Sequence, residues 1–411
     1  MSAPAIKAER LRVNRFLPYG RQVIEEDDIA AVAEAMRGEL LTTGPYVGRF
    51  ESALAKTVGA KHAVVCANGT AALHMAARAL DLGPGTKVVV PAITFLATAS
   101  APHMNGAEIV FADVDPDTGL MTPETLAEAL ERAGHADAIF NVHLNGQCGA
   151  IEEIAQLARD HGARLVDDAC HSLGTGYVAA DGSATTIGSN AFCDLSVFSF
   201  HPVKSIAMGE GGAVTTNDPE LTKRLVRARS HGMTREPADF VNRDDAFDES
   251  GAPNPWYYEL VEPEFNWRAN DIQCALGLSQ LGKLGRFVAR RRAIAAAYDS
   301  LLAPLASILR PLARTRRALP AWHLYVVRID FAAAGISRAQ LMGDLAALGI
   351  GTQVHYFPVH RQPYYAERFE SPVLPGADHY YARALSLPLF ASMTQSDAET
   401  VVLALTGTLG L

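Results

Sequence analysis

The feature that most constrains this chain is the alternation of short apolar runs with amphipathic helical segments. From about residue 24, β-branched runs at 62–67, 87–92 and 107–114 alternate with helical patterns such as the one at 70–80. A helix between two strands carries the chain back across the sheet, so that the strands run parallel. The order therefore predicts an α/β fold in three layers, with a mainly parallel sheet between helices.

The same alternation continues to about residue 235, and we place a large α/β domain at 24–235. Residues 236–264 have no sustained period and contain acids, prolines and a Trp-Tyr-Tyr run at 256–258. A long loop inside a compact domain is either a functional lid or disordered, and the clustered aromatic residues favour the lid. We therefore predict that 236–264 forms a loop that acts as a substrate lid.

Beyond the loop, residues 265–411 combine a strongly helical stretch with strand-like runs at 323–330 and 353–360, followed by three further helical segments. This mixture predicts a smaller C-terminal α+β domain. The N-terminal segment 1–23 is a candidate to pack on it. A chain of 411 residues exceeds what one hydrophobic core usually supports, which agrees with two domains.

Charge and cysteine content exclude several classes of function. The chain has 36 Lys and Arg against 45 Asp and Glu, a formal charge of −9, and no dense basic run, so we expect neither nucleic acid nor an anionic membrane as a partner. The five cysteines include no CxxC pair, which argues against a disulfide framework or a zinc site. No signal-peptide core or run of 18 apolar residues occurs, so we expect a cytoplasmic protein and no metal.

Two motifs place ligand-binding groups where strands end. In CANGTAAL (66–73) a strand runs through Gly69 into a helix whose first N–H groups, with the Thr70 hydroxyl, suit a phosphate. In VDDACHSLG (166–174) Asp167 and Asp168 follow an apolar strand and point to opposite faces, so one of them can meet a ligand. An ordinary capped turn and structural acids are the alternatives.

A third motif supplies a candidate reactive amine. Lys204 follows the strand-like FSFHPV and precedes glycines at 209, 211 and 212. A lysine is usually a solvated surface charge, but in an apolar or cationic pocket its pKa falls and it can form a Schiff base with a carbonyl. Pyridoxal 5′-phosphate requires all three groups: a helix N-terminus for its phosphate, an aspartate for its ring nitrogen and a lysine for its aldehyde.

At this point the sequence resembles a known family, the fold-type-I pyridoxal-phosphate sugar aminotransferases of the DegT/StrS family, over essentially its whole length. The matching segments are LPYGRQVI (17–24), LLTTGPYVGRFE (40–51), NGTAALHMA (68–76), PAITFLATA (91–99), VDDACHSLG, FSFHPVK with GEGGAV, RSHGM (229–233) and FNWRANDIQCALGLSQL (265–281). The combination is specific, although no single segment is.

The resemblance implies roles for individual residues. Lys204 would be the Schiff-base lysine and the acid and base of proton transfer, and Asp168 would pair with the ring nitrogen. Phe95 would stack on one ring face, with His171 near the phenolic oxygen or the other face. The residues that would hold the phosphate are Gly69, Thr70, Ala71, Ser199 and, from the neighbouring subunit, Asn266. Candidate substrate contacts are Thr42, His201, Arg229, His231, Arg268 and His355.

The expected function is therefore transfer of an amino group from L-glutamate to a nucleotide-linked keto sugar, in a homodimer with shared active sites. Two rivals are a sugar 3-dehydratase of the same family, in which a histidine replaces the lysine, and a non-catalytic sugar-nucleotide-binding relative. Lys204 argues against the first, and the intact set of Thr70, Asp168 and Lys204 argues against the second. A dinucleotide oxidoreductase is excluded because no GxGxxG follows a strand.

Overall fold

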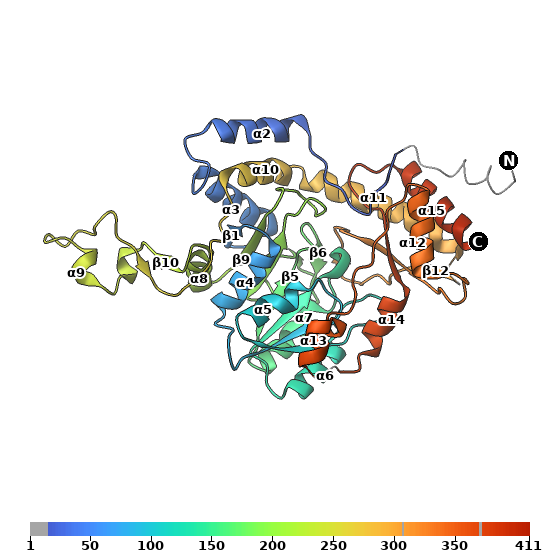
Figure 1. The fold of residues 1–411 in the computed structure, drawn as a ribbon, viewed down its shortest axis with the longest axis horizontal. Helices are drawn as coiled ribbons and strands as arrows, with labels where there is room; N and C mark the ends of the chain where they lie inside the picture. The colour runs from blue at the N-terminus through green and yellow to red at the C-terminus, as the bar shows by residue number, and fades with distance from the viewer. Residues whose placement is uncertain (1–14, 306–307, 370–371) are drawn as a thin grey trace.

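A computed structural model describes residues 15–411 apart from 306–307 and 370–371. Residues 1–14, part of the segment expected to pack on the smaller domain, lie outside the described residues. Helices surround a central sheet, a second group of helices and strands lies at the end of the molecule that holds the C-terminus, and an arm projects from the opposite end (Figure 1).

The central sheet has seven strands in the spatial order β1-β9-β8-β5-β4-β2-β3. Their bounds are His62–Cys66, Gly212–Thr216, Leu195–Ser199, Arg164–Asp168, Ala138–Val142, Lys87–Pro91 and Glu108–Ala112, in that order. Strands β8, β5, β4, β2 and β3 pair in parallel, whereas β9 is antiparallel to both of its neighbours. The predicted mainly parallel α/β sheet is confirmed.

Helices cover both faces of this sheet. Alternate strand residues point to opposite faces: Val88 and Val90 belong to the hydrophobic cluster beneath α4, α5 and α8, whereas Val89 belongs to the cluster beneath α6 and α7. These helices span Gly69–Ala79, Ala97–Met104, Pro219–Arg229, Pro123–Ala133 and Ile151–Asp160. Thr122 caps α6 as its sequence suggests, since its side chain accepts from the N–H of Thr125.

A second hydrophobic core lies in the C-terminal part of the chain. It is built on an antiparallel sheet in the order β12-β14-β15 and on helices α11, α12 and α15. These elements span Leu309–Pro311, Tyr325–Ile329, Ala384–Leu387, Leu284–Leu302, Arg338–Ala347 and Gln395–Leu409. Leu17 is buried in the same core and forms an isolated bridge with Ile350, so the start of the described N-terminal segment packs there.

Two details differ from the expectation for the C-terminal part. Residues 353–360 form no strand: Gln353 makes one isolated bridge to Ser386, and the strand paired with β14 is 384–387 instead. Helix α10 (Asp271–Leu281) packs on α2 (Glu26–Arg37) and α3 (Pro45–Val58) and contributes Cys274 to the core around Phe50. The limit at residue 265 stays a prediction, but α10 packs with the elements of the large sheet.

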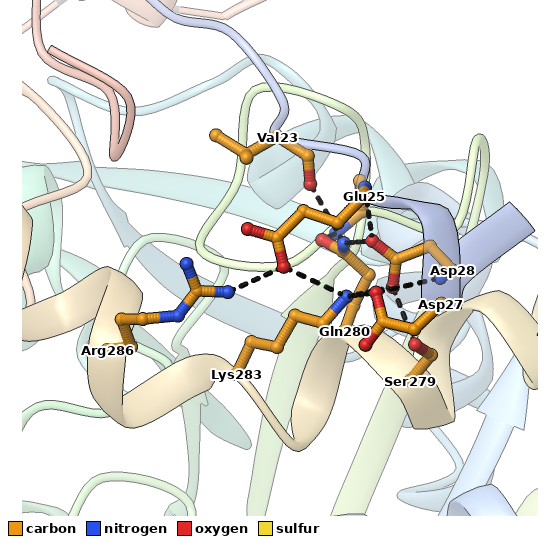
Figure 2. A network of polar contacts seen from close by, with 9 residues as sticks. Val23, Glu25, Asp27, Asp28, Ser279, Gln280, Lys283 and Arg286 are labelled. Atoms are coloured by element: carbon orange, nitrogen blue, oxygen red, sulfur yellow. Dashed lines mark hydrogen bonds and ion pairs between the residues drawn. The ribbon is translucent and has the colours of Figure 1, made fainter.

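A polar network fixes α10 to α2 (Figure 2). The fully buried Asp28 accepts hydrogen bonds from Ser279 Oγ at 2.6 Å and Gln280 Nε2 at 2.7 Å, and its carboxylate lies 2.8 Å from Lys283 Nζ. A buried carboxylate with several charge-assisted partners is strongly directional. The network therefore fixes how α2 and α10 pack on each other.

Residues 233–264 form an arm with local structure. Strands β10 (Met233–Thr234) and β11 (Glu259–Leu260) pair at its base, and α9 (Arg243–Ala246) lies towards its tip. The arm extends away from the body beside α8 (Figure 1). Within the described parts of the chain, no helix has the length and hydropathy to cross a membrane.

Candidate active site

A cavity of about 660 Å³ opens where the parallel strands of the large sheet end, and residues from 353–357 of the C-terminal part line its other side. Asp168 is the last residue of β5, Ser199 is the last residue of β8, and Gly69 is the first residue of α4, just beyond β1. Parallel strands present their carboxyl ends at one edge, which is why residues far apart in sequence meet here. Lining residues from the predicted set are Gly69, Thr70, Phe95, Asp168, His171, Ser199, His201, Lys204 and His355.

One end of the cavity is formed by the start of α4. Asn68 caps the helix by accepting from the N–H of Ala71 at 2.9 Å, so the N–H groups of Gly69 and Thr70 are left for a ligand. The backbone is packed too tightly here for larger residues: a Cβ on Gly212 would lie 2.2 Å from the Asn68 carbonyl oxygen, and one on Gly69 would lie 2.9 Å from Ser199 Cβ. This end suits a phosphate group.

Asp168 supplies a carboxylate at another position along the cavity. Its Oδ2 accepts from Thr98 Oγ1 at 2.7 Å and its Oδ1 accepts from the N–H of Cys170 at 3.2 Å. Asp167 points to the other face, where its Oδ2 lies 3.1 Å from His143 Nε2. The expectation that only one of the two acids reaches the cavity is therefore correct.

Lys204 presents its amine in the same cavity. Burial lowers the pKa of Lys204, and the charge of Asp168 opposes that effect. The loop that carries the lysine is held from behind by Arg291, which is 2% exposed and donates to the carbonyls of Val203 and Lys204. A lysine with a lowered pKa has a larger neutral fraction, which is the form that acts as a nucleophile or base.

Three neutral histidines lie around the amine. Burial lowers the pKa of His171 and His323 well below the ordinary value and that of His355 to about 3, and in each case the charge of Lys204 acts in the same direction. His171 Nδ1 accepts from the N–H of Asn145, so the ring proton is on Nε2, which lies 3.2 Å from the Tyr356 hydroxyl.

Several lining residues were not predicted from the sequence: Tyr19, Thr94, His323, Gln353 and Tyr356. Tyr356 contacts both predicted ring-stacking residues, with ring centroids 6.0 Å from Phe95 and 6.1 Å from His171. These residues come from the N-terminal segment, a strand-following loop and the C-terminal part. For four of them the only local signal was membership of matched motifs such as LPYGRQVI; His323 lies in no matched motif, and no periodicity marked any of the five.

The remaining predicted residues do not line this chain's cavity: Thr42, Ala71, Arg229, His231, Asn266 and Arg268. Ala71 is buried in the first turn of α4. Arg229 donates to Glu51 Oε1 at 2.6 Å, so its guanidinium is already paired within the chain. The arm contributes no lining residue to the cavity of its own chain, and its role as a lid stays a prediction.

The cavity can therefore hold a ligand with a phosphate, a basic ring nitrogen and a carbonyl, and pyridoxal 5′-phosphate has all three. The helix start would hold the phosphate, Asp168 would pair with the nitrogen and Lys204 would bind the aldehyde.

Comparison with known proteins agrees with this arrangement. The model of the DegT/DnrJ/EryC1/StrS aminotransferase family matches residues 22–406. The spore coat polysaccharide biosynthesis protein SpsC of Bacillus subtilis (strain 168) is 36% identical over 392 residues, 95% of this chain and 96% of that protein.

Solved structures of similar fold include aminotransferases. Helicobacter pylori PseC, an aminotransferase involved in the biosynthesis of pseudoaminic acid, superposes with a TM-score of 0.86 at 28% identity, over 96% of this chain and 100% of that one. The putative sugar aminotransferase Spr1654 of Streptococcus pneumoniae in its PLP form gives 0.83 at 27% identity, over 96% and 99%.

Proposed function

Because the chain belongs to the DegT/DnrJ/EryC1/StrS aminotransferase family, we propose that it transfers the amino group of L-glutamate to the C4 keto group of a UDP-linked 4-keto-6-deoxy N-acetyl sugar. The coarser activity follows from the family: the chain is a sugar aminotransferase that depends on pyridoxal 5′-phosphate.

Support for the particular sugar comes from two sources. The segments PWYYEL, RSHGM, QVHYFPVH and ALSLPLF resemble the 4-aminotransferase that forms UDP-4-amino-4,6-dideoxy-N-acetyl-β-L-altrosamine, on the way to pseudaminic acid. PseC, an aminotransferase involved in the biosynthesis of pseudoaminic acid, superposes over the whole of its own chain. A GDP- or dTDP-linked 3- or 4-keto sugar is the alternative, and the likeness to DesI, solved with its TDP-sugar product, favours the dTDP form among these.

The bound cofactor supplies the electron sink and the carrier of the amino group. The chain's own residues would hold the cofactor in position and would carry protons to and from the substrates. The start of α4 and Ser199 would hold the phosphate, and Asp168 would hold the protonated ring nitrogen. Lys204 Nζ would take the proton from the α-carbon of glutamate and, in the second half of the reaction, deliver one to C4 of the sugar, a role favoured by its lowered pKa.

One observation carries the proposal: an amine with a lowered pKa shares a cavity with an aspartate and a helix N-terminus that suits phosphate. The test is a panel of UDP-, GDP- and dTDP-linked 3- and 4-keto sugars, with L-glutamate as donor and release of 2-oxoglutarate as the measurement. The highest kcat/KM should be obtained with the UDP-linked 4-keto N-acetyl sugar. A higher value with a dTDP- or GDP-sugar would reject the nucleotide assignment.

We also propose a homodimer with shared active sites. Five of the predicted site residues do not line their own chain's cavity: Thr42, Arg229, His231, Asn266 and Arg268. Of these, Asn266 is the residue that we expect to reach the cofactor phosphate of the partner subunit. The arm projects away from the body beside α8 (Figure 1) and lines no part of its own chain's cavity, so we propose that it acts as a lid on the neighbouring subunit. Large apolar side chains are exposed on or beside these segments and would be covered by a second copy: Leu40, Leu41, Trp256, Leu260 and Phe265.

Mixing two inactive variants tests the shared site. If Lys204→Ala and Asn266→Ala proteins exchange subunits, one of the two sites in each mixed dimer regains both residues, and part of the activity should return. No recovery in mixtures shown to contain mixed dimers would contradict the shared-site proposal. We further place the enzyme in the cytoplasm, because a reducing compartment suits five free cysteines.

A further inference from the structure

Asp168 accepts a hydrogen bond from the hydroxyl of Thr98, which is itself paired with the hydroxyl of Thr94, and neither hydroxyl has another assigned role. Thr98 Oγ1 lies 2.7 Å from Asp168 Oδ2, and Thr94 Oγ1 lies 2.8 Å from Thr98 Oγ1. Both threonines are buried, at 0% and 1% exposure, and Asp168 is 5% exposed. Thr94 lines the cavity directly, and Thr98 lies behind it in the first turn of α5.

Carboxylate chemistry fixes the direction of these hydrogen bonds. An ionised carboxylate can only accept, so the hydroxyl proton of Thr98 is donated to Asp168. The oxygen of Thr98 is then the acceptor for the hydroxyl proton of Thr94. Both protons of this short relay therefore point towards Asp168, while its other oxygen accepts from the N–H of Cys170.

The two hydroxyls are not explained by packing. Within the ranges that the structure describes, their hydroxyls bond only to each other and to Asp168. Burying a hydroxyl costs free energy unless it is paired, and valine would fill the same space without that cost. The hydroxyls are therefore accounted for by what they do to the carboxylate.

We propose that Thr98, supported by Thr94, is a positioning residue that orients the carboxylate of Asp168 towards the ring nitrogen of the cofactor. This inference rests on the role of Asp168 in the proposed function. With one oxygen bound to Thr98 and the other to a backbone N–H, the carboxylate cannot rotate freely, and its remaining lone pairs are left for the ligand. A hydrogen bond to a charged group contributes more than a neutral one.

The experiment compares affinity for pyridoxal 5′-phosphate with affinity for its 1-deaza analogue, which has carbon in place of the ring nitrogen. The proteins are wild type, Thr98→Val, Thr98→Ser and Thr94→Val. Thr98→Val should weaken binding of the cofactor roughly 10- to 100-fold, as expected for loss of a hydrogen bond to a charge. Its affinity for the analogue should stay within about threefold of wild type, because the analogue has no ring nitrogen to pair with the carboxylate of Asp168.

The serine variant keeps the hydroxyl, so it should bind the cofactor nearly as well as wild type. Thr94→Val should have a smaller effect than Thr98→Val, because it acts through Thr98. Melting temperatures of the four apoproteins show whether each variant folds. If Thr98→Val does not fold, the comparison of Thr94→Val with wild type and Thr98→Ser still tests the inference.

Equal loss of affinity for both ligands in Thr98→Val, or no loss for either, would overturn the inference, since packing alone does not distinguish the two ligands. Asp168→Asn should show the same discrimination as Thr98→Val. If it binds both ligands as wild type does, the role of Asp168 itself is wrong. If no sugar of the panel is aminated but Thr98→Val still distinguishes the cofactor from its 1-deaza analogue, the proposed substrate is rejected and the positioning role of Thr98 stands.

Discussion

The histidines around Lys204 should make the folded protein sensitive to acid, and His355 gives the clearest case. His355 is 6% exposed, its Nδ1 lies 2.7 Å from Ser386 Oγ, and burial lowers its pKa from 6.5 to about 3. Below pH 6.5 the imidazole is protonated in the unfolded chain but still neutral in the folded one. The unfolded state then binds more protons, so stability is lost as the pH falls.

The magnitude follows from the interval between the two pKa values. Each pH unit within it costs about 1.4 kcal/mol, so His355 alone should lower the free energy of unfolding by about 2 kcal/mol between pH 7.5 and pH 5. His171 and His323 act in the same direction, because burial lowers their pKa values as well. Wild type should therefore lose more than this amount over the same interval.

The assay compares urea unfolding of apoprotein at the two pH values for wild type and His355→Gln. Glutamine keeps a polar group for Ser386 but does not titrate, so the variant should lose about 2 kcal/mol less than wild type. His135→Gln, at an exposed position, is the control and should leave the loss unchanged. An equal loss in wild type and His355→Gln would refute the reasoning, whatever the absolute stabilities.

Three further predictions concern the active site. Gly212→Ala should weaken cofactor binding at least tenfold in a dialysis or fluorescence titration, because its Cβ would lie 2.2 Å from the Asn68 carbonyl oxygen; unchanged affinity would show that the phosphate end adapts. Tyr356→Phe removes the hydroxyl beside His171 and should lower kcat by roughly tenfold with little effect on melting temperature, and wild-type kcat would exclude a role for that hydroxyl. Lys204→Ala should abolish turnover while the protein still folds, and substantial activity without an added amine would rule out its proposed role.

The sequence was sufficient for the features that depend on local pattern. Apolar strands alternating with helices predict the large sheet, because each crossing helix forces parallel pairing. Gly69, Asp168 and Lys204 could be placed together because residues at the carboxyl ends of parallel strands share one edge. The opposite directions of Asp167 and Asp168 followed from the two-residue period of a strand, in which neighbouring side chains point to opposite faces.

Features that depend on long-range packing could not be predicted in this way. His323 and Tyr356 come from the C-terminal part of the chain yet line the cavity beside the ends of the large sheet, and no local pattern encodes that arrangement. Residues 353–360 are apolar enough to suggest a strand, but the partner position beside β14 is occupied by 384–387. Arg229 looked like a free anion anchor, yet Glu51, 178 residues earlier, already pairs with it.

The threonine relay shows the same limit on a smaller scale. Thr94 and Thr98 are four residues apart, and their spacing gives no hint that Asp168, 70 residues later, accepts from Thr98. A hydroxyl in an apolar segment is a weak signal in sequence. It becomes informative only when burial and a charged partner are known.

The most direct test of the central claim is chemical identification of the residue that binds the cofactor. The protein loaded with pyridoxal 5′-phosphate is treated with borohydride, digested and mapped by mass spectrometry. The account predicts that the pyridoxyl group is fixed on the peptide that carries Lys204, and that Lys204→Ala protein gives no such peptide. Attachment to another lysine, or no attachment in protein that has bound the cofactor, would contradict it.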